Sequence, residues 1–211
     1  MLKENLNWRY ATKKMNGSKV PQDKIDYILE ATRLAPSSSG LQPFEILVIS
    51  GQEWLSKIIP TAMGGNQILL ADASHVLVFA AWNNYSVEKV NKVFDRTLAE
   101  RGLPANSMDD YKKMLLGMFS QRTAEENFQH AAKQAYLSFG ITLAAAAEQH
   151  VDATPMEGFN AQALDEVLNL KEKGLRSTVI LALGYRDEAN DWLAKLKKVR
   201  TPISEFITVL S

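Results

Sequence analysis

Three short runs of apolar residues constrain the fold of this chain more than any other feature of its sequence. The runs cover residues 45–49, 75–81 and 178–183, and none of them alternates between apolar and polar residues. Continuous apolar strands are typical of a sheet whose two faces are both covered. Helical patterns separate the three runs, so the sequence predicts a layered domain of the α+β or α/β type.

Four segments carry the period of a helix. Residues 23–34 form an amphipathic pattern, and apolar stripes recur at helical spacing within 87–98 and 111–119. The fourth helix is expected over 126–150, where many small residues indicate a buried helix that other helices approach closely, from this chain or from a second subunit. The tail, 205–210, alternates like a strand and needs a sheet to join.

Composition excludes several classes of protein. No linker, repeat or low-complexity tract interrupts the 211 residues, so one domain over 1–211 is expected. The 24 basic residues equal the 24 acidic ones, which gives no indication of nucleic-acid binding. The absence of cysteine excludes disulfides, thiolate nucleophiles and cysteine-ligated metals. No signal peptide or membrane span is recognisable, so a cytoplasmic location is expected.

Several familiar catalytic and nucleotide-binding motifs are missing. The sequence contains no G-x-G-x-x-G after a strand, no Walker loop, no H-E-x-x-H and no G-x-S-x-G. Its three histidines are isolated, which argues against a zinc site, and His75 is expected to be structural. The chemistry of this chain therefore does not rest on a recognisable set of catalytic side chains.

Basic pairs lie near both ends of the chain. Arg9 and Lys13 are four residues apart with a hydroxyl between them, and Lys198 and Arg200 form a second pair. Such pairs suit an anion, because guanidinium and ammonium groups make strong charge-assisted hydrogen bonds. The alternatives are a solvated N-terminal arm and the basic end of an amphipathic helix around Trp192.

Two loops offer polar groups beside apolar segments. Residues 36–39 place three serine hydroxyls before the first predicted strand, a position where ligand loops are common, although capping of a helix end is the simpler explanation. Glu157 and Gly158 lie in a turn in which the glycine allows close approach to the backbone. A plain turn explains that pair equally well.

Taken together, these segments resemble the nitroreductase family of FMN-dependent oxidoreductases. The resemblance is collinear over nearly the whole chain. It rests on the ordered blocks 9–13 (RYATK), 35–44 (APSSSGLQPF), 72–76 (DASHV), 155–159 (PMEGF), 171–174 (KEKG) and 198–200 (KVR). It implies the α+β nitroreductase-like fold, with a central mixed β-sheet flanked by helices. It also implies a domain-swapped homodimer, in which the C-terminal strand reaches across to the partner.

The resemblance also implies where FMN would bind. Arg9, Lys198 and Arg200 would bind the phosphate, whereas Lys13 would lie along the pyrimidine edge of the ring and favour the reduced flavin. Asn66 would bind the polar rim of the ring. The backbone of residues 156–158 would face flavin N5, and the loop 36–39 would cover the flavin of the other subunit. The complete implied set is Arg9, Tyr10, Ala11, Thr12, Lys13, Pro36, Ser37, Ser38, Ser39, Asn66, Met156, Glu157, Gly158, Lys198 and Arg200.

The implied activity is the transfer of hydride from NADH or NADPH and the reduction of nitroaromatic or quinone acceptors, in ping-pong order. No metal is expected. Met114, Leu116 and Phe119, together with Lys13, are candidates for the acceptor pocket, although their helical spacing also fits core packing. The alternatives are a flavin-binding protein without useful turnover and a related flavin enzyme, such as a dehalogenase or an enone reductase.

Two positions depart from the family pattern. Ala11 stands where some members have serine, which removes one hydroxyl contact to the phosphate. Leu69 stands where many members carry a second lysine beside the flavin. With that cation absent, the flavin is expected to be somewhat harder to reduce.

Overall fold

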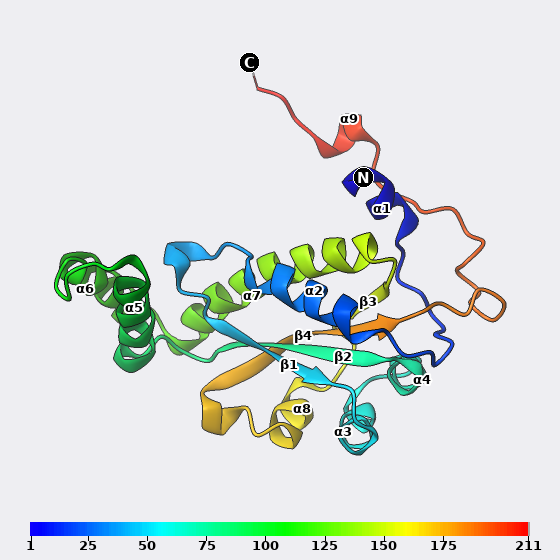
Figure 1. The fold of residues 1–211 in the computed structure, drawn as a ribbon, viewed down its shortest axis with the longest axis horizontal. Helices are drawn as coiled ribbons and strands as arrows, with labels where there is room; N and C mark the ends of the chain where they lie inside the picture. The colour runs from blue at the N-terminus through cyan, green and yellow to red at the C-terminus, as the bar shows by residue number, and fades with distance from the viewer. Residues whose placement is uncertain (211) are drawn as a thin grey trace.

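The centre of the fold is a four-stranded β-sheet that lies between two layers of helices (Figure 1). The structure is a computed structural model and describes residues 1–210. The strands follow the order β1-β2-β4-β3 across the sheet. Their bounds are Phe44–Ile49 for β1, His75–Trp82 for β2, Asp152–Met156 for β3 and Leu175–Gly184 for β4.

Helices cover both faces of this sheet. The long helix α7 packs with α2 on one face, whereas α3 and α8 lie on the other, and α5 and α6 extend beyond one end (Figure 1). The helices are α1 (Leu2–Trp8), α2 (Gln22–Arg33), α3 (Gln52–Ile58), α4 (Asn66–Asp72), α5 (Val87–Arg101), α6 (Asp109–Ser120), α7 (Ala124–Glu148), α8 (Ala161–Val167) and α9 (Ile203–Phe206).

The strand β2 is buried along its whole length and separates two hydrophobic cores. Leu77 and Phe79 pack into the core formed with α2 and α7. Val78 and Ala80 belong to the core that also contains residues of α3 and α8. This alternation follows from the two-residue period of a strand. Because both faces exclude water, the run needs no polar positions, and the prediction of a fully covered strand is confirmed here.

Local capping signals set the ends of the predicted helices. Thr123 and Glu126 form a capping box at the start of α7, in which each side chain accepts a hydrogen bond from the backbone N–H of the other. Ser86 caps α5, which ends at Gly102 in the left-handed conformation (φ 61°). The helices predicted over 23–34, 87–98, 111–119 and 126–150 are therefore confirmed with small shifts of their ends.

The first predicted strand is observed as β1, but the expectation that both its faces are covered is wrong. Glu45 is exposed and Val48 is 45% exposed. Within residues 1–210, β1 pairs only with β2, so it forms one edge of the sheet. The helices cover the inner strands more completely than this edge, and the apolar run therefore includes solvent-facing positions.

All three strand pairings are antiparallel, so the mixed sheet implied by the resemblance is not present within residues 1–210 of one chain. The connections explain this difference. Ile49 at the end of β1 lies opposite Val76 at the start of β2, because α3 and α4 return the chain to the same end of the strands. A parallel pair would need a crossover connection to the opposite end.

The C-terminal segment does not form the strand predicted over 205–210. Residues 203–206 form the short helix α9, and 207–210 have no regular structure. Figure 1 shows this segment leading away from the body of the molecule, and its Phe206 and Val209 are 76% and 81% exposed. No strand of the same chain lies beside it, within residues 1–210, to complete the pairing. Residues 192–195 form turns and residue 196 a bend, so the helix considered around Trp192 is not present in this segment.

Short elements account for most of what the sequence did not indicate. The sequence predicts a turn for Glu157, Gly158 and the residues before them, but residues 154–156 belong to the strand β3, whose five residues include a proline and pair with β4. The helices α1, α4 and α8 have seven residues each, too few to show a clear period. Across the described part of the chain, no helix is both long and apolar enough to cross a bilayer.

Candidate functional site

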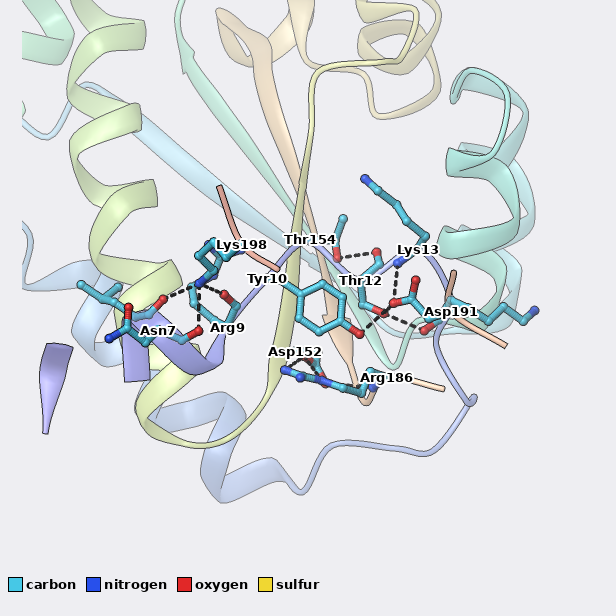
Figure 2. Close-up of polar contacts among 12 residues, drawn as sticks. Asn7, Arg9, Tyr10, Thr12, Lys13, Asp152, Thr154, Arg186, Asp191 and Lys198 are labelled. Carbon is cyan, nitrogen blue, oxygen red and sulfur yellow. Dashed lines mark hydrogen bonds and ion pairs between the residues drawn. The ribbon is translucent and has the colours of Figure 1, made fainter. Parts of the chain in front are cut away.

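The segment 9–13 is fixed to the C-terminal part of the chain by one buried carboxylate, that of Asp191. The Asp191 Oδ2 atom accepts hydrogen bonds from the Thr12 hydroxyl (2.6 Å), the Tyr10 hydroxyl (2.8 Å) and the Lys13 backbone N–H (3.1 Å) (Figure 2). Its Oδ1 atom accepts from the Leu193 backbone N–H at 2.9 Å. Thr12 is fully buried and Asp191 is 5% exposed. The segment is therefore held in one place rather than forming a solvated arm.

These hydrogen bonds change the ionisation of both partners. Burial opposes the charge on Asp191, but the donors from Thr12, Leu193, Tyr10 and Lys13 outweigh it and lower the pKa of the carboxyl group. Burial and the hydrogen bond to Asp191 raise the pKa of Tyr10 to about 12. The pair is thus an ionised carboxylate that accepts from a neutral phenol.

The same segment is also attached to the sheet. The Thr154 hydroxyl on β3 donates to the Thr12 carbonyl at 3.0 Å. A few residues further along, Met15 forms an isolated antiparallel bridge with Arg186, just beyond the end of β4. The N-terminal segment therefore runs beside the end of the sheet, next to the chain that leads to residues 198 and 200.

Lys198 joins the C-terminal segment to α1. Its ammonium donates to the carbonyls of Leu6 (2.6 Å), Asn7 (3.1 Å) and Arg9 (Figure 2). These carbonyls belong to the last turn of the helix and its C-cap, where backbone acceptors are unpaired and a cation is favourable. Arg9 of the N-terminal basic pair therefore lies beside Lys198 and Arg200 of the C-terminal pair, whereas Lys13 is not part of this junction.

Four cations gather around this junction, namely Arg9, Arg186, Lys198 and Arg200. Burial and the charges of Arg200 and Arg186 lower the pKa of Arg9, and the nearby carboxylate of Asp152 opposes this only in part. Burial, Arg9 and Arg200 lower the pKa of Lys198 in the same way. The Nε atom of Arg9 is buried without a hydrogen-bond partner among the described residues. An excess of positive charge with an unused buried donor is the environment that an anion such as a phosphate requires.

A second part of the predicted site comes together at the start of α4. The side-chain amide of Asn66 donates to the Gly158 carbonyl at 3.0 Å. A Cβ atom on Gly158 would lie 2.7 Å from the Asn66 Nδ2 atom, so only glycine fits without movement. The neighbouring Glu157 accepts a 2.5 Å hydrogen bond from the hydroxyl of Tyr136 on α7, and burial raises the pKa of that phenol. Asn66 and the turn 156–158, far apart in sequence, are thus adjacent.

The loop 36–39 lies elsewhere. It follows the C-terminal end of α2, whereas segment 9–13 lies toward the opposite end of that helix (Figure 1). The loop is nevertheless ordered by its neighbours. Ser38 N–H donates to Gln134 on α7 at 2.8 Å, and the Tyr111 hydroxyl on α6 donates to Ser39 at 2.9 Å. One chain therefore does not bring its own serine loop to its own cationic cluster.

The three α6 residues that are candidates for the acceptor pocket occupy different environments. Phe119 is 3% exposed and stacks on Tyr85, with the ring centroids 3.8 Å apart. Met114 is 54% exposed, and Leu116 is half-buried. The core-packing alternative therefore describes Phe119, whereas Met114 faces outward.

Comparison with known proteins identifies the family. The sequence model described as "Nitroreductase family" matches residues 6–185. This chain belongs to the nitroreductase family. It is 31% identical over 207 residues to the oxygen-insensitive NAD(P)H nitroreductase of Salmonella typhimurium, covering 95% of each chain. It is 30% identical over 215 residues to the major NAD(P)H-flavin oxidoreductase of Aliivibrio fischeri, covering 98% of this chain and 97% of that protein.

The fold of this nitroreductase-family chain matches solved structures of the same family. A protein from Exiguobacterium sibiricum, described as a nitroreductase and solved in complex with FMN, superimposes with a TM-score of 0.85. That match covers 100% of this chain and 97% of the other, at 21% sequence identity. The expected family and the expected nitroreductase-like fold are both confirmed.

Sequence reasoning missed three residues of this region. Asp191, Asp152 and Tyr136 lie in segments without a recognisable motif, and each becomes important through a partner far along the chain. A single acidic residue among turn residues carries no signal of burial. Only the pairing of hydroxyl-rich segment 9–13 with some buried acceptor could have been anticipated.

Proposed function

We propose that this protein is an FMN-dependent oxidoreductase that uses NADH or NADPH to reduce nitroaromatic or quinone-type acceptors. The observation that carries the proposal is the cationic cluster around the unpaired, buried Arg9 Nε atom of the described chain. The cluster is built from both ends of the chain and matches the charge of a flavin phosphate. The printed names of the Salmonella and Aliivibrio relatives, and the FMN bound to the Exiguobacterium protein, support the same cofactor and nucleotide.

When bound, FMN supplies the redox chemistry, taking a hydride from the nicotinamide nucleotide and then passing electrons to the acceptor in ping-pong order. In this proposal the residues of the chain bind FMN and orient it. Arg9 and Arg200 hold the phosphate directly. Lys198 adds charge nearby while its ammonium continues to donate to the carbonyls of Leu6, Asn7 and Arg9.

The ring of the flavin would lie toward Lys13 and Asn66. The Lys13 side chain extends away from Asp191 and makes no hydrogen bond or ion pair with the described part of the chain, so its ammonium is available to the pyrimidine edge (Figure 2). Asn66 and the backbone of Glu157 and Gly158 would face the polar rim and N5. Leu69 is 2% exposed, so this position contributes apolar packing rather than a second cation.

A complete site would need two copies of the chain. The loop 36–39 would cover the flavin of the other subunit, together with Met114 and Leu116 of α6 as the wall of the acceptor pocket. The exposed apolar tail over 203–210 would cross to the partner, where the unpaired edge of β1 offers backbone donors and acceptors. Phe119 is left out of the proposed pocket because its ring is buried against Tyr85.

The central experiment is cofactor loading followed by anaerobic reduction. The purified protein is expected to bind FMN and turn yellow, NADH or NADPH should bleach it, and a nitro compound or quinone should restore the colour. Failure to take up FMN would refute the flavin proposal. A yellow protein that neither nucleotide bleaches would favour the binding protein without turnover.

Oligomeric state tests the shared site separately. Light scattering should give the mass of a dimer for the flavin-loaded protein, and removal of residues 203–210 should weaken that dimer. A flavin-loaded monomer would contradict the shared-site arrangement but would leave the phosphate assignment intact.

A further inference from the structure

Arg186 is held on three sides beside the proposed phosphate site. Its guanidinium lies 4.3 Å from the centroid of the Trp8 ring and 4.5 Å from that of Tyr10. Its Nε atom donates to the Asp152 carboxylate at 2.8 and 3.0 Å (Figure 2). The side chains of Arg186 and Asp152 are 15% and 3% exposed. An arginine between two aromatic faces and a buried carboxylate is a rigid, desolvated cation.

These contacts engage most of the Arg186 guanidinium within the protein. Asp152 accepts from Nε and lies 2.6 Å from Nη2, although Nη2 has no aligned hydrogen-bond partner among the described residues, and the Cζ atom lies over the Trp8 and Tyr10 rings. The Arg186 backbone N–H also donates to Asp152, at 2.8 Å, which fixes the main chain at the same point. The negative charge of Asp152 is therefore engaged directly by Arg186, although it also opposes the lowering of the Arg9 pKa by burial and by Arg200.

The two aromatic residues that hold Arg186 are the chain neighbours of Arg9. Trp8 ends α1, and Arg9 follows with extended backbone angles (φ −71°, ψ 140°). In extended backbone, neighbouring side chains point to opposite sides. With Trp8 and Tyr10 both fixed on Arg186, we expect the Arg9 side chain to leave the main chain on the opposite side from these two rings.

We propose that Arg186, through its stack with Trp8 and Tyr10, is a positioning residue that fixes the direction of the Arg9 guanidinium toward the flavin phosphate. The proposal rests on the FMN site proposed above and adds a residue that does not touch the cofactor. It predicts that the contribution of Arg186 depends on two things, the phosphate group of the ligand and the presence of Arg9.

The test compares the affinities of the apoprotein for FMN and for riboflavin, which lacks the phosphate, by quenching of flavin fluorescence. Arg186→Met should weaken FMN binding about tenfold or more, the loss expected for one misdirected charge-assisted contact, and change riboflavin binding much less. Arg9→Gln should show the same selectivity. The double variant should bind FMN no more weakly than Arg9→Gln alone, because Arg186 acts through Arg9.

Two further variants separate positioning from folding. Trp8→Leu removes one face of the stack and leaves the ion pair with Asp152 intact, so it should reduce FMN affinity several-fold even if Arg186→Met unfolds. Arg176→Met is the matched control. Arg176 also stacks on a ring, 3.7 Å from the centroid of Phe128, and also pairs with a carboxylate, Glu125 at 2.7 Å, but it lies at the far end of β4. Its replacement should leave the ratio of FMN to riboflavin affinity unchanged.

A failure of the proposed FMN site can be distinguished from a failure of the positioning role of Arg186. Wild-type protein that binds riboflavin as tightly as FMN would refute the phosphate site, and with it the proposed function. Wild-type preference for FMN, combined with equal losses for both flavins in Arg186→Met and Trp8→Leu, would refute positioning and leave a purely structural role. Additive losses in the Arg9 and Arg186 double variant would mean that Arg186 binds the phosphate independently, which would also overturn the proposal.

Discussion

The hydroxyl of Thr12 donates a 2.6 Å hydrogen bond to the carboxylate of Asp191, 179 positions further along the chain. Both groups are buried, and Tyr10 and the Lys13 backbone donate to the same oxygen. This one carboxylate therefore organises the N-terminal segment that carries Arg9 and Lys13. It also anchors the chain just before Lys198 and Arg200. The proposed cofactor site therefore depends on Asp191, although this carboxylate does not contact the cofactor.

Replacing Asp191 by asparagine should destabilise the protein and weaken FMN binding together. The neutral amide would lack the charge that strengthens four hydrogen bonds, and a cost of about 1–3 kcal/mol is expected in the free energy of unfolding. Urea unfolding of the apoprotein measures this cost, and flavin fluorescence measures the affinity. Glu30→Gln, at an exposed pair with Arg33, is the control and should change neither.

The stability lost in Asp191→Asn should depend on pH in a defined direction. The folded protein lowers the pKa of Asp191, so the carboxylate stabilises the fold fully above its ordinary pKa of about 3.9. This contribution is lost as the pH falls through the lowered value. The difference between wild type and variant should be constant from about pH 5 to 8 and shrink below about pH 4. A difference that grows on acidification would contradict the assignment.

Lys198 and Arg200 should have separable roles. Lys198→Met removes the donor to the carbonyls at the end of α1, so the C-terminal segment should be cleaved faster by chymotrypsin at the exposed Phe206. Arg200→Met should reduce FMN affinity by about tenfold, the effect of one charge-assisted contact, without that increase in cleavage. Equal cleavage rates for the two variants would show that Lys198 does not anchor the segment.

Gly158→Ala should weaken flavin binding through Asn66. The new Cβ atom would approach the Asn66 Nδ2 atom to 2.7 Å, so the amide must move and its 3.0 Å hydrogen bond to the residue 158 carbonyl is strained or lost. We expect a stability loss of about 1 kcal/mol. The double variant with Asn66→Ala should bind FMN as Asn66→Ala does alone. A further loss in the double variant would place the effect on the backbone turn instead.

The two α6 residues Phe119 and Met114 should respond in opposite ways. Phe119→Ala removes a buried ring stacked on Tyr85 and should cost about 3–5 kcal/mol of stability, measured by urea unfolding. Met114→Ala is at an exposed position and should change stability by less than about 0.5 kcal/mol. If Met114 lines the acceptor pocket of a dimer, its variant should alter KM for the acceptor and leave the rate of flavin reduction by NADPH unchanged.

The sequence alone determined the features that depend on local pattern. Periodicity predicted α2, α5, α6 and α7, because a helix that packs on one face must repeat its apolar residues every three to four positions. Uninterrupted apolar residues predicted the inner strands β2 and β4. The order of short motifs along the chain was sufficient for the family, since several weak signals in a fixed order are more specific than any one of them.

The tertiary structure alone decided which of these elements meet. The exposure of β1 depends on its place at the edge of the sheet. Whether the tail over 205–210 forms a strand depends on whether another strand lies beside it. Asp191 with Thr12, and Arg186 with Asp152, Trp8 and Tyr10, are pairings across long stretches of chain. Their strength comes from burial and from distances of a few ångströms, and neither is written in the residues adjacent to them. For this reason the cations of the candidate site could be named from the sequence, whereas the groups that hold them could not.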